Sequence, residues 1–127
     1  MSGKTVATDK APQAIGPYSQ AIEAGGFLFC SGQIPLDPAT GELKGSEIGE
    51  QTEQVLDNIA AILEAAGLTF ADVVKTTIFL VDLSHFATVN EVYGRRFAAA
   101  PPARSTLEVS GLPRGALVEI EVVAVRR

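Results

Sequence analysis

The most constraining feature of the sequence is an apolar run close to the C-terminus, residues 117–125. Side chains of a β-strand alternate between the two faces of its sheet, and the two alternating sets in this run differ in character. One set is entirely apolar and the other combines two carboxylates with two valines: Val118, Ile120, Val122 and Ala124 against Glu119, Glu121, Val123 and Val125. The run is therefore predicted to be a strand with one face in the core and the other at a partly polar surface.

Two stretches have helical periodicity instead. The first lies between Ser46, a predicted N-cap with Glu47 in the first turn, and Gly67, a predicted C-terminal glycine. The second is predicted to begin at Ser84 and to end before Pro101-Pro102. Their apolar stripes are Val55, Ile59, Ile62, Leu63 and Ala66 in the first helix, and Phe86, Val89, Tyr93 and Phe97 in the second.

Five further segments have strand composition and are separated by turn sequences: residues 5–7, 18–24, 27–31, 73–83 and 103–109. Gly25-Gly26 predicts a tight hairpin, and Thr69 with Asp72 predicts a capping box on a short helical turn. In the long strand 73–83, alternation assigns Val74, Ile78 and Leu80 to one face, and Phe79, Val81 and Leu83 to the other.

The order of these elements, β-β-β-α-β-α-β-β, predicts an α+β fold in one domain, residues 1–127, with one sheet and both helices on one of its faces. Two helices cover only one face of a sheet. The other face carries valines beside glutamates, which suits contact with another copy of the chain. We therefore expect a homo-oligomer.

Composition narrows the classes of function. The formal net charge of −5 and the lack of basic residues interleaved with aromatics argue against nucleic-acid binding. One cysteine and one histidine exclude an intrachain disulfide and provide too few ligands for a structural zinc site. We find no apolar run of ~18 residues, no secretory signal and no nucleotide-binding motif, so we expect a cytoplasmic protein without membrane contact, metal or cofactor.

Two charged residues are the main candidates for chemistry. Arg104 follows a rigid Pro-Pro-Ala segment at the start of a strand, where a guanidinium can hold a carboxylate through two parallel hydrogen bonds. Its other interpretation is a surface arginine paired with a glutamate. Glu119 lies in mid-strand, where partial burial would raise its pKa towards values useful in acid–base catalysis. It can equally be a solvated carboxylate, and the pattern does not separate it from Glu121.

Other residues are interpreted as structural. Cys30 lies in an apolar strand and His85 beside a helix start, so a core cysteine and a surface histidine are favoured over a catalytic pair. The segment from Asp37 to Glu42 lacks the alternating oxygen ligands of a calcium loop and is interpreted as a turn. Tyr18 and Tyr93 are, from their pattern alone, packing residues.

Taken together, these segments resemble the RidA/YjgF family over nearly the whole chain. The matching stretches occur in the family's order: residues 14–20 (AIGPYSQ), 31–35 (SGQIP), 57–67, 74–77 (VKTT), 86–90 (FATVN), 102–105 (PARS) and 118–127. The resemblance implies a chorismate-mutase-like fold of the bacillus type and a homotrimer with its sites in clefts between subunits. It also implies an imine deaminase, which hydrolyses enamine and imine products of pyridoxal-phosphate dehydratases, such as 2-aminoacrylate, to 2-keto acids and ammonia.

The resemblance also implies roles for single residues. Arg104 corresponds to the arginine that holds the substrate carboxylate, and Glu119 to the carboxyl group that positions the attacking water and moves protons. Residues expected to form the rest of the substrate site are Tyr18, Ser31, Gly32, Asn90 and Thr106. Thr106 stands where some family members have a cysteine, so a thiol is replaced by a hydroxyl. The segment 98–101 looks shorter than in family members, which would alter the rim of the cleft.

Two other functions fit parts of the same sequence. One is a non-catalytic module that binds a small carboxylate, such as a keto acid, and regulates a partner. The other is an endoribonuclease or translation inhibitor, an activity ascribed to relatives, against which the net charge of −5 argues.

Overall fold

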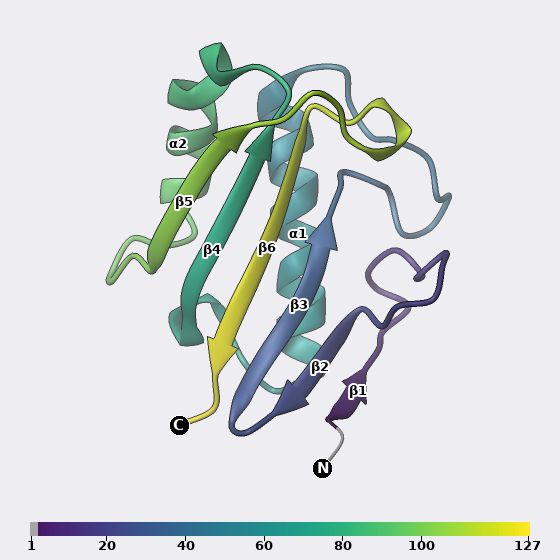
Figure 1. The fold of residues 1–127 in the computed structure, drawn as a ribbon, viewed down its shortest axis with the longest axis vertical. Coiled ribbons are helices and arrows are strands. Elements are labelled where there is room, and N and C mark those ends of the chain that lie inside the picture. The colour runs from purple at the N-terminus through teal and green to yellow at the C-terminus, as the bar shows by residue number, and fades with distance from the viewer. Residues whose placement is uncertain (1–2) are drawn as a thin grey trace.

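The computed structural model describes residues 3–127, which form one six-stranded sheet with two α-helices against one of its faces (Figure 1). The strands are β1 (Lys4–Val6), β2 (Ala21–Ala24), β3 (Phe27–Gln33), β4 (Val73–Leu80), β5 (Ala103–Glu108) and β6 (Val118–Val125), and the helices are α1 (Ile48–Ala65) and α2 (Phe86–Gly94). The sheet order is β1-β2-β3-β6-β4-β5, in which β4 and β5 are parallel and all other neighbours are antiparallel. The predicted α+β class is confirmed.

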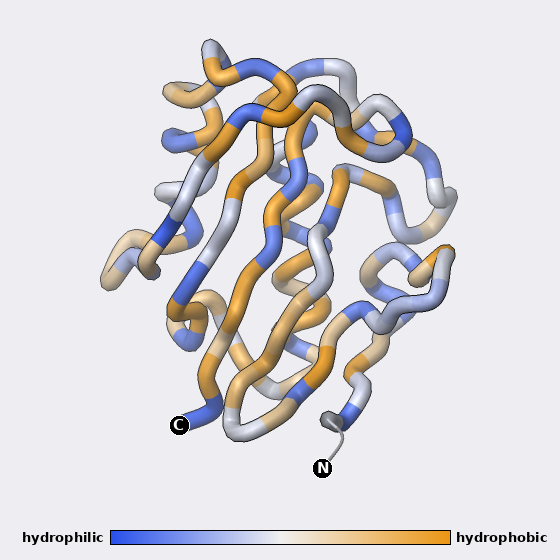
Figure 2. Tube along the Cα trace, in the orientation of Figure 1, coloured by the Kyte–Doolittle hydropathy of each residue, from blue (hydrophilic) through white to orange (hydrophobic). Residues whose placement is uncertain are grey.

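The core lies between the helices and the inner face of the sheet. Alternate residues of β6 are buried as its pattern predicts: Val118, Ile120 and Ala124 are fully enclosed. They pack with the apolar stripe of α1, in which Val55, Ile59 and Ile62 are also fully buried. Figure 2 shows the alternation of hydrophobic and hydrophilic residues along the sheet.

Strand β4 differs from its prediction at both ends. A β-bulge between Val73 and Lys75 shifts the register, so that Val73 is buried and Val74 is 37% exposed. The assignment of Val74 to the face of Ile78 was therefore wrong. The strand also ends at Leu80 instead of Leu83, because Asp82 is the N-cap of a short 3₁₀ helix, η2 (Leu83–His85), that follows it.

The predicted helix caps are partly wrong. Ser46 does not cap α1, whose N-cap is Glu47 without a side-chain bond, and Ser84 lies inside η2, so that α2 begins only at Phe86. The Thr69–Asp72 capping box is confirmed on η1 (Phe70–Asp72). The turn glycines are also confirmed, since Gly25, Gly26 and Gly67 have φ of 59°, 81° and 75°, in the left-handed region.

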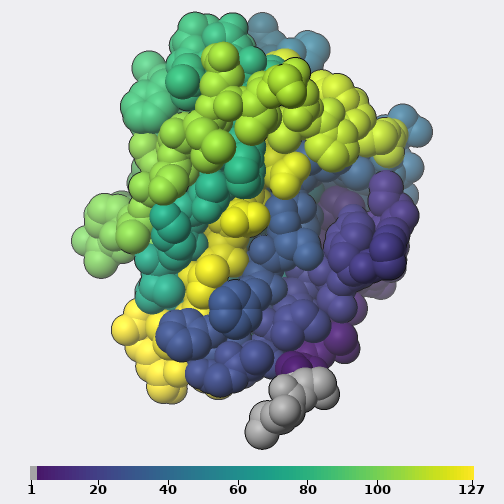
Figure 3. Space-filling model, in the orientation of Figure 1, coloured from purple at the N-terminus to yellow at the C-terminus, as the bar shows by residue number. Residues whose placement is uncertain are grey.

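The other face of the sheet has no layer over it among residues 3–127 and faces the viewer in Figure 3. It exposes several large apolar side chains: Phe27 at 41%, Phe29 at 48% and Leu107 at 40%. Side chains alternate along β3: Leu28 and Cys30 are buried on the inner face, so Phe27 and Phe29 lie on the open face. Within the described part of the chain, no helix combines the length and apolar composition needed to cross a bilayer.

Candidate active site

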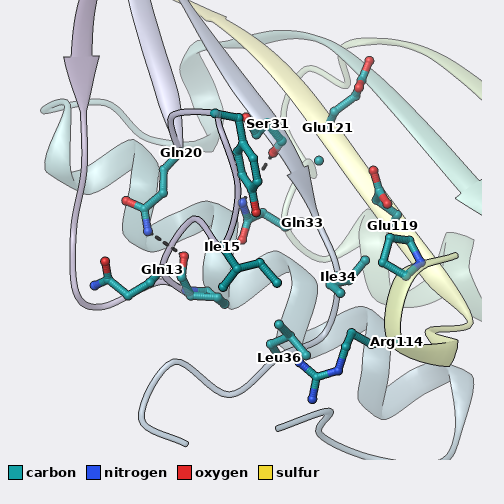
Figure 4. Close-up of a pocket in the computed structure, with 14 residues that line it drawn as sticks. Gln13, Ile15, Gln20, Ser31, Gln33, Ile34, Leu36, Arg114, Glu119 and Glu121 are labelled. Carbon is teal, nitrogen blue, oxygen red and sulfur yellow. Dashed lines mark hydrogen bonds between the residues drawn. The ribbon is translucent and has the colours of Figure 1, made fainter. Parts of the chain in front are cut away.

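A cavity of about 560 Å³ opens where the open face of β3 and β6 meets the loops around residues 12–20 and 113–114 (Figure 4). Four predicted site residues line it together: Tyr18, Ser31, Gly32 and Glu119. Its remaining wall combines apolar residues, such as Ile15, Ile34 and Leu36, with polar and charged ones. Figure 4 shows Ile15 and Ile34 between Ser31 at one end and Arg114 at the other.

Glu119 is placed by an irregularity in its neighbouring strand. The pairing of β3 with β6 shifts between Cys30 and Gln33, so Ser31 and Gly32 form a bulge beside the carboxylate. A Cβ at position 32 would meet the Glu119 carboxyl group, at 2.8 Å from its Cδ. The space that glycine leaves is therefore the space that the carboxyl group occupies.

The local environment of Glu119 favours its neutral form. Burial raises the pKa of Glu119, and the negative charge of Glu121 on the same face of β6 raises it further. A carboxylate whose pKa is raised is a stronger base than an exposed glutamate, which suits a group that accepts and returns a proton in a cavity. Of the two interpretations of Glu119, a partly buried carboxyl group and a solvated carboxylate, this environment favours the first.

The wall of the cavity formed by Ser31 and the loop before β2 is fixed by hydrogen bonds to backbone carbonyls. Ser31 Oγ donates to the carbonyl oxygen of Ser19 at 2.6 Å, and the Ser31 amide donates to the carbonyl oxygen of Gln20. The buried Gln20 amide in turn donates to three carbonyls, those of Thr8, Ala11 and Pro12. This network positions the loop that carries Tyr18, which is 51% exposed at the mouth of the cavity.

Arg104 lies elsewhere, on the edge strand β5. Its register partner is Thr76, so its side chain starts on the helix-covered face of the sheet. Its guanidinium carbon lies over two rings of α2, at 5.0 Å from the centre of Tyr93 and 5.5 Å from that of Phe86. Within residues 3–127 the guanidinium has no ion pair, so its N–H groups are available to a ligand.

Thr106 and Asn90 belong to the same group as Arg104. Thr106 is two residues along β5, as alternation predicts, and its hydroxyl is buried without a hydrogen-bond partner in the described part of the chain. Asn90 is four residues from Phe86 and three from Tyr93, which places it on their side of α2.

The predicted site residues thus form two groups. Arg104, Thr106 and Asn90 do not line the cavity that contains Glu119. β4 separates their strands, and Glu119 shares its face with its register partner Phe79, opposite to the face of Thr106. One chain does not bring the two groups together.

The alternative catalytic pair is absent. Cys30 is buried in the core, and burial raises the pKa of its thiol to about 12, so it is not a thiolate at neutral pH. The segment at Asp37 is a hydrogen-bonded turn, in which Asp37 accepts from Ala39 and Gly41. Across residues 3–127, no three metal-binding side chains cluster together.

One charged residue of the cavity was not predicted from the sequence. Arg114 lines the cavity from the turn before β6, with a backbone φ of 63°, and lies 4.0 Å from a carboxylate oxygen of Glu42. Its place in a Pro-Arg-Gly turn just before the strand of Glu119 is a pattern that could have indicated it.

Comparison with known proteins identifies the family. The profile described as Endoribonuclease L-PSP matches residues 8–126. The chain belongs to this family. It is 51% identical over 127 residues to the 2-iminobutanoate/2-iminopropanoate deaminase of Escherichia coli, with 98% of each protein covered.

Two solved structures share the fold. The E. coli YjgF gene product has a TM-score of 0.93 and 51% identity, over 98% of this chain and 99% of that one. E. coli TdcF with bound serine has a TM-score of 0.93 and 45% identity, with the same coverage. The RidA/YjgF resemblance and the chorismate-mutase-like fold are therefore confirmed.

Proposed function

We propose that this chain is a 2-iminobutanoate/2-iminopropanoate deaminase, which hydrolyses 2-imino acids and their enamine tautomers, such as 2-aminoacrylate, to 2-keto acids and ammonia. The single observation that carries the proposal is the Glu119 carboxyl group, with its raised pKa, enclosed beside Gly32 in a cavity. The E. coli relative that carries this activity in its name supports the choice of substrate.

The reaction asks for little from the protein. A protonated imine is already electrophilic at C2, so the protein has to hold the substrate carboxylate, place one water molecule and move protons. Glu119 takes a proton from the water as its oxygen bonds to C2, and returns that proton to the nitrogen. The resulting carbinolamine, protonated on nitrogen, collapses to the keto acid as the C–N bond breaks and Glu119 accepts the hydroxyl proton. Glu119 then passes that proton to the departing ammonia, which leaves as ammonium.

Arg104 is proposed to hold the substrate carboxylate. Its planar guanidinium has no ion-pair partner within the described chain, and it offers two parallel N–H groups to a carboxylate. Thr106, with an unpartnered hydroxyl, and Asn90 would complete that end of the site.

The separation of the two groups supports a shared site. The open face of the sheet exposes Phe27, Phe29 and Leu107, and a second copy covering it would bring an Arg104 group to the Glu119 cavity of its neighbour. We propose the homotrimer that the family resemblance implies, acting in the cytoplasm. Light scattering on the purified protein tests the assembly, and a monomeric mass at micromolar concentration would contradict it.

The activity is tested in a coupled assay with an enzyme that produces the imine. A serine or threonine dehydratase generates the imine, and we expect this protein to accelerate the loss of imine absorbance in proportion to its concentration. Arg104→Ala should remove most of the acceleration. A wild-type protein that leaves the decay rate unchanged for imines of serine and threonine would overturn the proposal.

A second candidate is a binding module without turnover. A solved relative holds serine, an amino acid with the same carboxylate as the proposed substrates. Calorimetric titration with 2-oxobutyrate distinguishes the two functions, because tight binding together with no hydrolysis of any imine would favour the module.

A further inference from the structure

Two aromatic rings of α2 form a shelf under Arg104. The Arg104 guanidinium carbon lies 5.0 Å from the ring centre of Tyr93 and 5.5 Å from that of Phe86. A guanidinium attracted to a ring face keeps its in-plane N–H groups free for a carboxylate. Since no ion pair within residues 3–127 holds Arg104, the contacts that fix its orientation are these rings.

The Tyr93 ring is itself held on two sides. Its hydroxyl forms a 2.8 Å hydrogen bond with the Thr76 hydroxyl, and both residues are buried, at 5% and 1% exposure. The Phe97 ring packs 4.5 Å from the Tyr93 ring. Burial raises the pKa of Tyr93, so its hydroxyl stays protonated. Phe86, in contrast, is 41% exposed, so Tyr93 is the more rigid part of the shelf.

We infer that Tyr93 is a positioning residue, whose ring holds the Arg104 guanidinium in the orientation that receives the substrate carboxylate. The inference rests on the proposed function and assigns Tyr93 a role that its sequence pattern, which indicated only packing, did not. A long arginine side chain loses rotamer freedom when it grips a ligand, and a shelf that fixes it during folding removes part of that loss from binding.

The test compares two ring deletions of similar size on α2 and its C-terminal extension. Tyr93→Leu removes the ring under Arg104, whereas Phe97→Leu removes a buried ring that contacts Tyr93 without lying under the guanidinium. We expect Tyr93→Leu to raise KM for 2-iminobutanoate and Kd for 2-oxobutyrate roughly 3- to 30-fold, with kcat within about twofold, as the range of cation–π energies predicts. Phe97→Leu, which loosens one support of the Tyr93 ring but keeps the ring itself, should raise both constants clearly less than Tyr93→Leu does, and Tyr93→Phe, which keeps the ring and its contact with Phe97, should restore values near wild type.

A double-mutant cycle separates positioning from general structural damage. In an Arg104→Ala background, Tyr93→Leu should raise Kd for 2-oxobutyrate no further, because the group it positions is gone. Additive effects in that cycle would overturn the inference. If Tyr93→Leu does not fold, Phe86→Leu at the exposed half of the shelf is expected to give a smaller rise in the same two constants.

The outcomes also separate this inference from the proposed function. If the wild-type protein binds 2-oxobutyrate but hydrolyses no imine, the proposed deaminase activity is contradicted. The role of Tyr93 is then tested by comparing the Kd for 2-oxobutyrate in wild type and in Tyr93→Leu. An active enzyme with unchanged KM and Kd in both Tyr93→Leu and Phe86→Leu contradicts only the role of the shelf. Absence of binding and turnover in the wild type contradicts both.

Discussion

The two groups of site residues are held in place by different means. Ser31, Gly32 and Glu119 lie on β3 and β6, which are central strands with hydrogen-bonded neighbours on both sides. Arg104 and Thr106 lie on β5, the edge strand, which among residues 3–127 pairs with β4 alone. Backbone geometry fixes the first group, and aromatic contacts with α2 orient Arg104 in the second.

This difference matches the demands of the proposed reaction. A carboxyl group that moves protons has to be placed accurately relative to water, and a bulge in a central strand provides such a fixed position. A cation that recruits a ligand has to be accessible, and a sheet edge is where a neighbouring copy of the chain can reach it. The proposed shared site would thus combine a rigid reacting half, which contains Glu119, with an accessible binding half, which contains Arg104.

The largest expected effect comes from the reacting half. Glu119→Gln keeps the size of the side chain but removes its ability to accept a proton, so kcat should fall on the order of 10²- to 10⁴-fold with little change in KM. Burial raises the pKa of Glu119, so its ionised form destabilises the folded protein at neutral pH, and this cost disappears below the ordinary carboxyl pKa. The melting temperature of Glu119→Gln at pH 7 should therefore be no lower than that of wild type. If the fall in kcat were matched by an equal loss of folded protein, a catalytic role for Glu119 would be contradicted.

The pH dependence of the rate sharpens the same point. If Glu119 acts as the base, kcat/KM falls as pH decreases through its pKa, about tenfold for each further unit, and the midpoint lies above the ordinary glutamate value of about 4.3. Glu121 contributes to the rise, so Glu121→Gln should lower the midpoint without abolishing activity. A midpoint that stays in place in Glu121→Gln would show that the two carboxylates do not interact.

The binding half should respond through KM instead. Arg104→Lys retains the positive charge but loses the planar pair of N–H groups, and lysine stacks less well on Tyr93. Loss of a charge-assisted bond predicts a rise in KM of about 10- to 100-fold. Steady-state kinetics with 2-iminobutanoate measure it, and a kcat effect as large as that of Glu119→Gln would remove the distinction between the halves.

Gly32 tests whether the bulge positions the carboxylate. Gly32→Ala places a Cβ against the Glu119 carboxyl group and should displace it, which predicts a fall in kcat on the order of tenfold. Gly94→Ala is the matched control, because a Cβ there would meet nothing else in the described part of the chain within 4 Å, apart from its chain neighbours and its own helix. Equal activities in the two variants would mean that Glu119 moves aside without cost to the reaction.

Periodicity alone was sufficient for the core of the fold. The alternation in β6 and four of the five stripe residues of α1 correctly predicted buried side chains, because one face of each element has to leave water. Ala66 is only partly buried, and Leu56, which the stripe did not include, is fully buried. The same reasoning failed at Val74, because alternation counts residues and a bulge adds one. Ser46 and Ser84 failed as caps for a related reason, since the pattern places a polar residue near a helix start but not at the right residue.

The arrangement of the site residues was harder to predict from the periodicity of the sequence. Alternation placed Arg104 and Thr106 on one face of their strand, which the structure bears out. It did not relate that face to the face of Glu119, because the relation depends on which residues pair across β4. Phe79 pairs with both Glu119 and Leu107, and this register is a property of long-range packing. The bulge at Gly32 and the shelf at Tyr93 depend on such contacts too.

The smallest expected effect concerns the network behind the cavity wall. Ser31→Ala removes the 2.6 Å bond from Oγ to the Ser19 carbonyl but keeps the backbone bond to Gln20, so the free energy of unfolding should fall by only about 1 kcal/mol. Ser105→Ala, which removes an exposed bond to Lys75 on the open face of the edge strand β5, should change that free energy by less. Chemical denaturation measures both.

Because the wall positions Tyr18 through the Ser19 segment, Ser31→Ala should also raise KM a few-fold, while Ser105→Ala should not. A larger kinetic effect at Ser105 would reverse the comparison, since it would locate the more sensitive geometry at the edge strand rather than at the central bulge.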